Sequence, residues 1–146
     1  MATDGKRKIF TDAVAPVVHE AAATAAVRPG ALVEQSATGV AESNDASTVF
    51  GKQALFADYD ILGAGDVDTS YAIGENVIFR KLPQDCTANV LVAASSNITS
   101  KGVGLASNGA GVLKIAAATG ADKIIAYSDE IINTGASVTL VKVKGA

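Results

Sequence analysis

From Arg28 onward, glycine, asparagine, aspartate and serine divide the sequence into short apolar runs. This punctuation constrains the fold more than any other feature, because short runs bounded by turn-forming residues are typical of the strands of a sandwich or barrel. The sequence therefore predicts an all-β fold. The expected strands are residues 31–34, 39–42, 53–57, 76–82, 89–93, 103–106, 111–115, 123–127 and 136–144.

One of the expected turns carries a strong hairpin signal. Asn108-Gly109 lies between the expected strands 103–106 and 111–115. Both residue types tolerate a positive φ, which the tight turns of β-hairpins require. These two strands are therefore expected to pair with each other.

The residues before Arg28 differ in character from the rest of the chain. Residues 8–14 are β-prone, and Pro16 then interrupts them. Residues 19–26 (HEAAATAA) are good helix formers, but an isolated helix of that length is marginal in water. We expect residues 1–27 to form an extended N-terminal arm with at most one short helix, and residues 28–146 to form the β domain.

The apolar content suggests a core with few large side chains. Apolar residues make up 49% of the chain, but much of this is alanine, and aromatic residues account for only 5%. Alanine buries little area, whereas a larger apolar side chain contributes about 1.5–3 kcal/mol on burial. We therefore expect a domain that associates with other subunits.

The charge and the cysteine content limit the partners. The net charge is -3, and the short basic run Lys6-Arg7-Lys8 does not offset it, so no nucleic-acid partner is expected. No run of about 18 apolar residues is present, so no membrane partner is expected either. The N-terminus lacks the apolar region of a secretory signal, and the only cysteine, Cys86, fits synthesis in the cytoplasm.

The sequence predicts no catalytic, cofactor or metal site. Nucleophilic catalysis needs a nucleophile, a base and a group that orients the base. The only histidine, His19, lies in the alanine-rich segment, and Cys86 lies in an expected turn that lacks the surroundings of a nucleophile. One histidine and one cysteine cannot form a zinc site within one chain. The acidic segments 58–60 and 66–68 offer oxygen ligands for calcium, but a solvated acidic loop is the preferred interpretation.

Glycines at 102, 104, 109 and 111 superficially resemble a phosphate-binding loop. Such loops lead from a strand into a helix N-terminus, whereas the predicted surroundings here are a hairpin. A phosphate site is therefore not expected.

The two halves of the chain also echo each other. Each half contains a leucine, a turn, a Gly-Val pair, a loop, and an apolar strand that ends in aspartate. In the first half these are residues 30–33, 39–40 and 54–58, and in the second half they are residues 103–106, 111–112 and 125–129. Two related units would suit a small pseudo-symmetric barrel, and chance similarity among short β segments is the alternative.

Several motifs occur in a fixed order along the chain. They are Arg28-Pro-Gly-Ala-Leu-Val33, Tyr71-Ala-Ile-Gly-Glu75-Asn-Val-Ile, Ala88-Asn-Val-Leu-Val-Ala93, Ile98-Thr-Ser-Lys-Gly102-Val-Gly-Leu and Asn108-Gly-Ala-Gly-Val-Leu113. In this order they resemble the capsid cement, or decoration, proteins of tailed bacteriophages. The alanine-rich stretch before Arg28 has no counterpart in the motifs of that family.

The resemblance implies a non-enzymatic structural virion protein with a small β-barrel or β-tulip-like domain, commonly a homotrimer. Such a protein is made in the host cytoplasm, binds the outer surface of the mature capsid and stabilises it by bridging major capsid protein subunits. The expected capsid-binding residues are Lys6, Arg7, Lys8, Ile9, Phe10 and Val14. Residues 9–14 would add a strand to a coat-protein sheet, with Phe10 as the anchor and the three basic residues facing acidic coat surface. Removing residues 1–15 should then leave a folded trimer that no longer binds capsids.

Other functions remain open on the sequence. A carbohydrate-binding or host-adhesion β-domain on the virion surface is the main alternative, and it would need an exposed aromatic platform. Phe50, Phe56, Tyr59 and Phe79 are instead expected in the core or in a subunit interface. A tail-tube or fibre segment and a small hydrolase are further alternatives.

Overall fold

The computed structural model describes residues 6–11, 17–47, 52–63 and 65–146. Over these residues the chain is all-β and contains no helix, which confirms the predicted fold class. It follows that no helix in this part of the chain has the length and apolar character of a membrane span. The strands are β1 (Val18–Ala22), β2 (Leu32–Ser36), β3 (Gly39–Glu42), β4 (Leu55–Ala57), β5 (Asn76–Lys81), β6 (Thr87–Val92), β7 (Asn97–Ile98), β8 (Gly104–Ser107), β9 (Leu113–Ile115), β10 (Ile124–Ser128), β11 (Ile132–Asn133) and β12 (Thr139–Gly145).

Every strand expected from the sequence has a counterpart in the structure. The strands that the sequence did not predict are β1, β7 and β11. The sequence allowed at most one short helix, at residues 19–26, and the described residues contain none, because residues 18–22 form a strand that pairs along its whole length with β5. The hairpin expected around Asn108 is confirmed: β8 and β9 are antiparallel, and the Asn108 N–H donates to the Val112 carbonyl over 2.9 Å.

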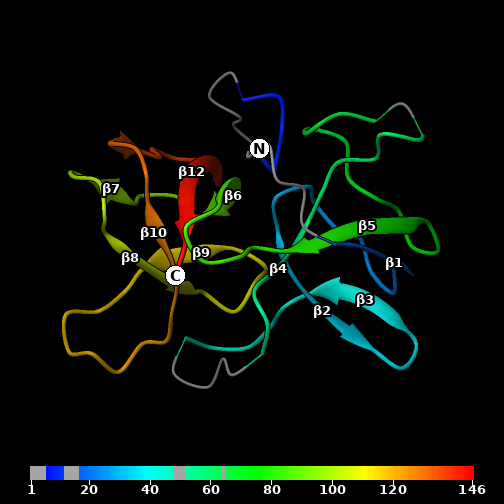
Figure 1. The fold of residues 1–146 in the computed structure, drawn as a ribbon, viewed down its shortest axis with the longest axis horizontal. Coiled ribbons are helices and arrows are strands. Elements are labelled where there is room, and N and C mark those ends of the chain that lie inside the picture. Colours follow the sequence, from blue (N-terminus) through cyan, green and yellow to red (C-terminus); the bar gives the residue numbers. More distant parts are fainter. Residues whose placement is uncertain (1–5, 12–16, 48–51, 64) are drawn as a thin grey trace.

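The C-terminal half of the chain forms a closed barrel with the strand order β10-β12-β6-β9-β8. Its neighbouring strands are antiparallel, except that β6 and β9 are parallel and meet at Val92 and Leu113. The Ala93 N–H donates to the Leu113 carbonyl over 2.8 Å at this junction. The sheet therefore closes at one short parallel contact (Figure 1).

The N-terminal half forms a five-stranded sheet with the order β1-β5-β4-β2-β3. Its outer strands also approach each other, because Ala23 and Val40 form a parallel bridge. The Thr24 N–H donates to the Val40 carbonyl over 2.9 Å. This sheet therefore curls round to a short parallel contact like the one that closes the barrel.

The two halves share one topology. We refer to β1–β5 as the first unit and to β6–β12 as the second unit. Reading each sheet from its first strand gives β1-β5-β4-β2-β3 in the first unit and β6-β12-β10-β8-β9 in the second. The short parallel contact joins the end of β1 to β3 in the first unit, and it joins β6 to β9 in the second unit. The second unit's small sheet, β7 with β11, matches the bridge between Val27 and Tyr71 in the first unit.

The echo between the two halves of the sequence thus corresponds to a repeated topology. Residues 54–58 and 125–129 align as the echo suggested, since Leu55 pairs with Lys81 and Ala126 pairs with Gly145 at matching positions. The first hairpin is offset by one residue. Pairing places Val33, rather than Leu32, at the position of Leu105.

Each unit has its own apolar interior. In the first unit it contains Ala23, Val33, Val40, Val77 and Phe79, all of which are buried. In the second unit it contains Val92, Leu105, Leu113, Val141 and Val143, which occupy the corresponding strand positions. The two sets differ mainly in side-chain size, which is the pattern expected when two copies of one topology are packed with different residues.

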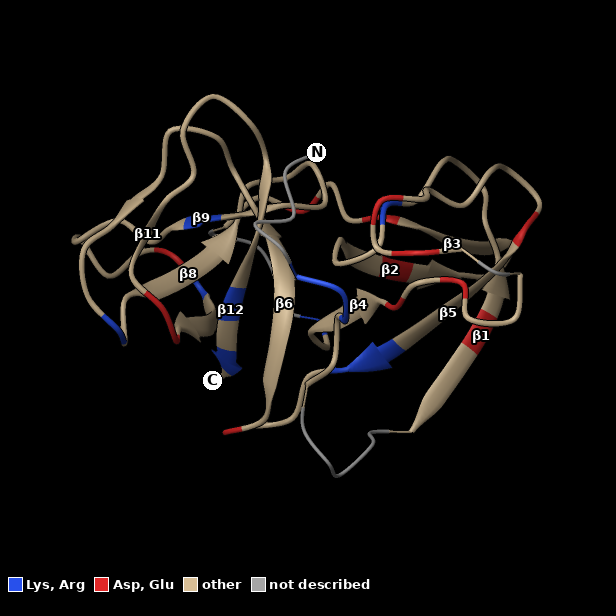
Figure 2. Cartoon of the chain, turned by 90° about the horizontal axis from the view of Figure 1, so that it is seen from above, with Lys and Arg blue, Asp and Glu red and all other residues tan. Residues whose placement is uncertain are grey.

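A third apolar cluster lies between the units, which sit side by side in Figure 2. Its buried members are Ile9, Ala31, Val67, Leu91, Val112 and Leu140. Polar contacts reinforce this seam: the Arg28 guanidinium binds both carboxylate oxygens of Glu42 over 2.7–2.8 Å and donates to the Ala110 carbonyl over 2.9 Å. The units are therefore packed as one body.

The residues expected in an N-terminal arm belong to this body wherever the structure describes them. Residues 18–22 form β1, and Ala23 and Val27 are buried in the first unit. Residues 9–11 run along the second unit. The boundary drawn at Arg28 from the change in composition is not visible as a change in packing.

Candidate functional site

The N-terminal segment, residues 6–11, covers the outer edge of β6. Phe10 forms an antiparallel bridge with Ala88. The Asn89 N–H donates to the Ile9 carbonyl over 2.6 Å, and the Thr11 N–H donates to the Thr87 carbonyl over 3.3 Å. The segment that was expected to pair with a coat-protein sheet therefore pairs with the protein's own barrel.

Ile9 is part of the seam between the units. Its side chain is fully buried and packs with Leu91 and Leu140. The Asn89 side-chain amide donates to the Lys8 carbonyl over 2.7 Å and holds the main chain just before it. The expectation that Ile9 projects towards a partner is corrected, because its burial fixes it inside the body.

Phe10 connects the edge of the second unit to the first unit. It is half-buried and contacts two of the apolar clusters. The Arg80 guanidinium lies over its ring at 5.8 Å from the centroid, within reach of a cation–π interaction. The Arg80 Nε in turn donates to the Asp58 carboxylate over 3.1 Å.

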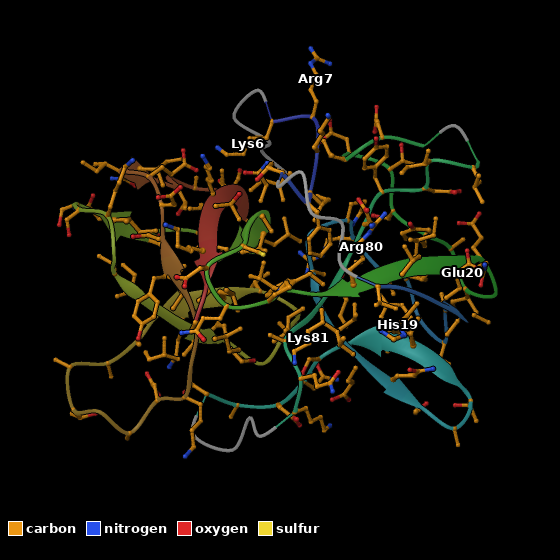
Figure 3. All side chains as sticks on the ribbon, in the orientation of Figure 1. Lys6, Arg7, His19, Glu20, Arg80 and Lys81 are labelled. Carbon is orange, nitrogen blue, oxygen red and sulfur yellow. The ribbon has the colours of Figure 1, made fainter. Side chains whose placement is uncertain are left out.

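The basic residues of the segment differ in exposure. The Lys6 ammonium lies 2.9 Å from the Glu130 carboxylate and is largely covered. Arg7 and Lys8 are exposed, and Arg7 extends away from the body in Figure 3. Val14 lies outside the described residues. Of the residues predicted to bind a capsid and described here, Arg7 and Lys8 present their full side chains to a partner.

Asp58 is a buried carboxylate close to this segment. Burial raises its pKa above the ordinary value, although hydrogen bonds from the Tyr59 N–H and the charge of Arg80 oppose the shift. Its main-chain carbonyl also accepts a hydrogen bond of 2.8 Å from the Tyr71 hydroxyl. Burial of the same kind raises the pKa of Tyr71 well above its usual range.

The raised pKa of Asp58 gives a testable pH dependence. As the pH falls from 7 towards 4, the native state takes up a proton before the unfolded state does, because the unfolded pKa is about 3.9. The free energy of unfolding of the wild type should therefore rise relative to that of Asp58→Asn over this range. Urea denaturation of both proteins at several pH values measures this difference.

Asp66→Asn is the matched control for this measurement. Asp66 is exposed, and hydrogen bonds from the Thr69 hydroxyl and the Asp68 N–H lower its pKa. Its contribution to stability is lost only as the pH falls below about 3.9. The free energies of unfolding of the wild type and Asp66→Asn should therefore differ by a constant amount from about pH 7 to 5. A wild-type advantage over Asp58→Asn that shrinks on acidification would mean that the Arg80 ion pair outweighs burial.

The structure does not bring His19 and Cys86 together in one site. His19 lies on β1 of the first unit, where its ring stacks on Phe79 with centroids 5.5 Å apart. Cys86 precedes β6 and packs, half-buried, against the interior of the second unit. The two side chains therefore belong to different units.

The acidic segments 58–60 and 66–68 are used to cap turns. The Asp60 carboxylate accepts a 2.9 Å hydrogen bond from the Gly63 N–H, and the Asp66 carboxylate accepts from the Asp68 N–H and the Thr69 hydroxyl. Within the described residues, no three His, Cys, Asp or Glu side chains are grouped to hold a metal ion.

A cavity of about 420 Å3 lies where the two units meet. Its lining residues are Lys52, Ala54, Lys81, Leu82, Gln84, Lys123, Ile124, Ile125 and Ala146. Lys52 is held by Glu34 and Asp45 at 2.7 and 3.1 Å. Among its described lining residues, lysine and apolar side chains occur together, and none is an aspartate, glutamate, histidine or cysteine.

Sequence reasoning missed a second surface, the outer edge of β1. Val17 and Val18 are 75% and 47% exposed, and His19 and Glu20 are exposed beside them. In Figure 3, His19 and Glu20 lie along this strand. The available signal was the β-branched pair Val17-Val18, which favours a strand, but the alanines that follow it favoured a helix.

No family model matches the chain, and no curated protein is similar to it at a significant level.

Proposed function

We propose that the protein is a structural component of a bacteriophage virion that binds the outside of the mature capsid. The supporting observation is that two pairs of large aliphatic residues, each pair consecutive in sequence, are exposed and belong to none of the three apolar clusters. Val17 and Val18 lie at the start of an edge strand, and Ile61 and Leu62 lie in a loop, with Leu62 83% exposed. Adjacent exposed aliphatic side chains are typical of surfaces that a protein partner covers.

The order of the motifs from Arg28 to Leu113 identifies the partner in this proposal. Because these motifs resemble capsid decoration proteins, the proposed partner is the major capsid protein, and the proposed location is the outer surface of the virion after synthesis in the host cytoplasm. A non-enzymatic role is part of this proposal. We include a homotrimer in the proposal, because several copies of a weak contact would then act together.

Binding alone is sufficient for the proposed stabilisation. A protein that binds the mature lattice, and not the disassembled coat, stabilises the lattice by mass action. At a free concentration 100 times the Kd, the gain is about 2.7 kcal/mol for each site. If the bound protein bridges neighbouring coat subunits, this free energy stabilises the contacts between those subunits.

Co-sedimentation with purified capsids tests the proposal. The protein should sediment with expanded capsids and stay in the supernatant with unexpanded ones, because only the mature lattice presents the complete site. Decorated capsids should also be disrupted at a higher temperature, by an amount that grows with free protein concentration. An unrelated acidic β-protein of similar size is the control, and equal recovery of the two proteins with expanded capsids would contradict the proposal.

The alternative of a carbohydrate-binding domain has a separate test. Phe56, Tyr71 and Phe79 are fully buried, and Tyr127 is the one tyrosine or phenylalanine of the described residues that is exposed. Binding on a glycan array, together with no binding to expanded capsids, would replace the proposed function by this one.

A further inference from the structure

The repeated topology equates the outer edge of β1 with the outer edge of β6. Ala23 of the first unit corresponds to Val92 of the second, because each makes the parallel contact that closes its sheet. His19 precedes Ala23 by as many residues as Ala88 precedes Val92, so His19 corresponds to Ala88. Val18 and Glu20 then correspond to Thr87 and Asn89, the residues that bind the N-terminal segment.

The main-chain groups of β1 at these positions face away from its partner strand. The Ala23 N–H donates to the Glu75 carbonyl over 2.8 Å. In an antiparallel pair the main-chain groups of alternate residues point the same way, so the N–H and carbonyl of His19 also point towards β5. Val18 and Glu20 lie between these positions and face the opposite edge. Within the described part of the chain, no hydrogen bond reaches the Val18 carbonyl or the Glu20 N–H on that edge.

Exposure shows the same difference between the two edges. In the second unit, Ala88 is fully buried and Asn89 is 5% exposed beneath the N-terminal segment. In the first unit, the corresponding His19 and Glu20 are exposed. The two edges share one topology, but only the edge of the second unit is covered.

We propose that the β1 edge receives an extended segment of the coat protein, antiparallel to β1. This inference rests on the proposed function and names the docking mode. The Glu20 N–H donates to a carbonyl of the added strand, and an N–H of that strand donates to the Val18 carbonyl. These are the two bonds that Asn89 and Thr87 make with Ile9 and Thr11 on β6.

The side chains around this edge specify the segment that fits. The residue opposite His19 takes the place that Phe10 has opposite Ala88, on the face where the His19 ring stacks on Phe79. A flat or branched apolar side chain fits that place, and an apolar neighbour fits opposite Val18 as a cross-strand pair. The protein's own N-terminal segment is committed elsewhere, because Ile9 is fully buried in its seam.

The polarity of strand addition is therefore opposite to the one expected from the sequence. The protein offers an edge that accepts a strand, and its β-prone residues 9–11 are used to cover its other edge. An uncovered edge strand with apolar residues is a site for pairing with another chain unless charge or proline blocks it.

The test compares Glu20→Pro with Glu20→Ala in co-sedimentation with expanded capsids. Proline removes the outward N–H and is tolerated in an edge strand where that N–H has no partner in the fold, whereas alanine keeps the N–H. Glu20→Pro should weaken capsid binding by about tenfold or more, and Glu20→Ala should stay within about threefold of the wild type. Circular dichroism and thermal melting verify that both variants are folded.

A second pair of variants decides the question if Glu20→Pro does not fold. Val18→Lys places a charge on the edge, which discourages pairing, while Val18→Thr keeps the β-branched shape. Because Val18 is 47% exposed, neither change should disturb the fold. Val18→Lys should weaken binding by about tenfold, and Val18→Thr should bind like the wild type within about threefold.

The outcomes separate this inference from the proposed function. If the wild type and all variants bind expanded capsids equally, the strand-addition inference is overturned and the proposed function stands. If Glu20→Ala loses as much binding as Glu20→Pro, the contact is made by the side chain and the inference is also overturned. If the edge variants instead change only the oligomeric state in light scattering, a second copy occupies the edge. A wild type that does not bind expanded capsids overturns both proposals.

Discussion

Replacing Ile9 by alanine is expected to lower the free energy of unfolding by about 2–5 kcal/mol. The Ile9 side chain is fully buried between the two units, and truncating it leaves a cavity against Leu91 and Leu140. The cost is the lost transfer free energy of the side chain plus the cavity that the surrounding residues cannot fill. Urea denaturation followed by circular dichroism measures the change.

Arg7→Ala is the matched control on the same segment. Arg7 is exposed, so its truncation should change the free energy of unfolding by no more than about 0.5 kcal/mol. If Ile9→Ala were as mild as Arg7→Ala, residues 6–11 would not be part of the folded body, and the free-arm interpretation would return.

The packing of Ile9 also corrects the expected effect of N-terminal deletion. Removing residues 1–15 was expected to leave the fold intact. The deletion removes Ile9 from the seam and exposes the outer edge of β6, where Asn89 and Thr87 bind the segment. It should therefore destabilise the protein and promote edge pairing between copies, so a loss of capsid binding by such a truncation would not identify a capsid contact.

The second large effect is expected for Gly39→Ala, which should lower the free energy of unfolding by about 3 kcal/mol or more. Gly39 begins β3 with a φ of +148°, a conformation that residues with a side chain rarely adopt. A Cβ atom there would also collide with the main-chain carbonyl oxygen of Ala22 and touch Thr24. Because that carbonyl belongs to the main chain of β1, it cannot move without opening the contact between β1 and β3.

Gly74→Ala separates strain from collision. Gly74 also has a positive φ, +87°, but a Cβ atom there has no neighbour within 4 Å. Its replacement should cost only the conformational strain of about 1–2 kcal/mol. Thermal melting of the two variants side by side gives the comparison, and equal losses would contradict a close approach of β3 to β1.

The two units show how far a shared topology permits divergence in packing. Phe79 in the first unit corresponds to Val143 in the second, and Ala23 corresponds to Val92, so equivalent positions in the two units hold side chains of different size. Total volume, rather than identity, is what a core must preserve. This freedom explains why the sequence echo was weak, although the strand order repeats in full.

The strands of the body could be predicted because their determinants are local. Asn108 and Gly109 begin the β8–β9 connection, where Gly109 has a φ of +83°, and this dipeptide by itself favours a hairpin turn. The boundaries of β3, at Gly39 and Glu42, follow directly from the turn residues that flank them. The candidate site was harder to predict from the sequence. Which residues are exposed on the edges of β1 and β6 depends on how segments distant in the sequence pack together.

The sequence by itself determined the all-β class, the positions of most strands and the tight turns, since turn residues and β-branched runs act within a few neighbours. Only the tertiary structure decided that residues 18–22 form a strand, because an alanine-rich segment takes the conformation of its partner, β5. Tertiary packing likewise decided that Ile9 is buried while Val18 is left at an open edge. Both residues are β-branched and look alike in sequence. They differ because the segment that contains Ile9 pairs with the edge of β6 and packs between the units, whereas no described segment pairs with the edge of β1 beside Val18.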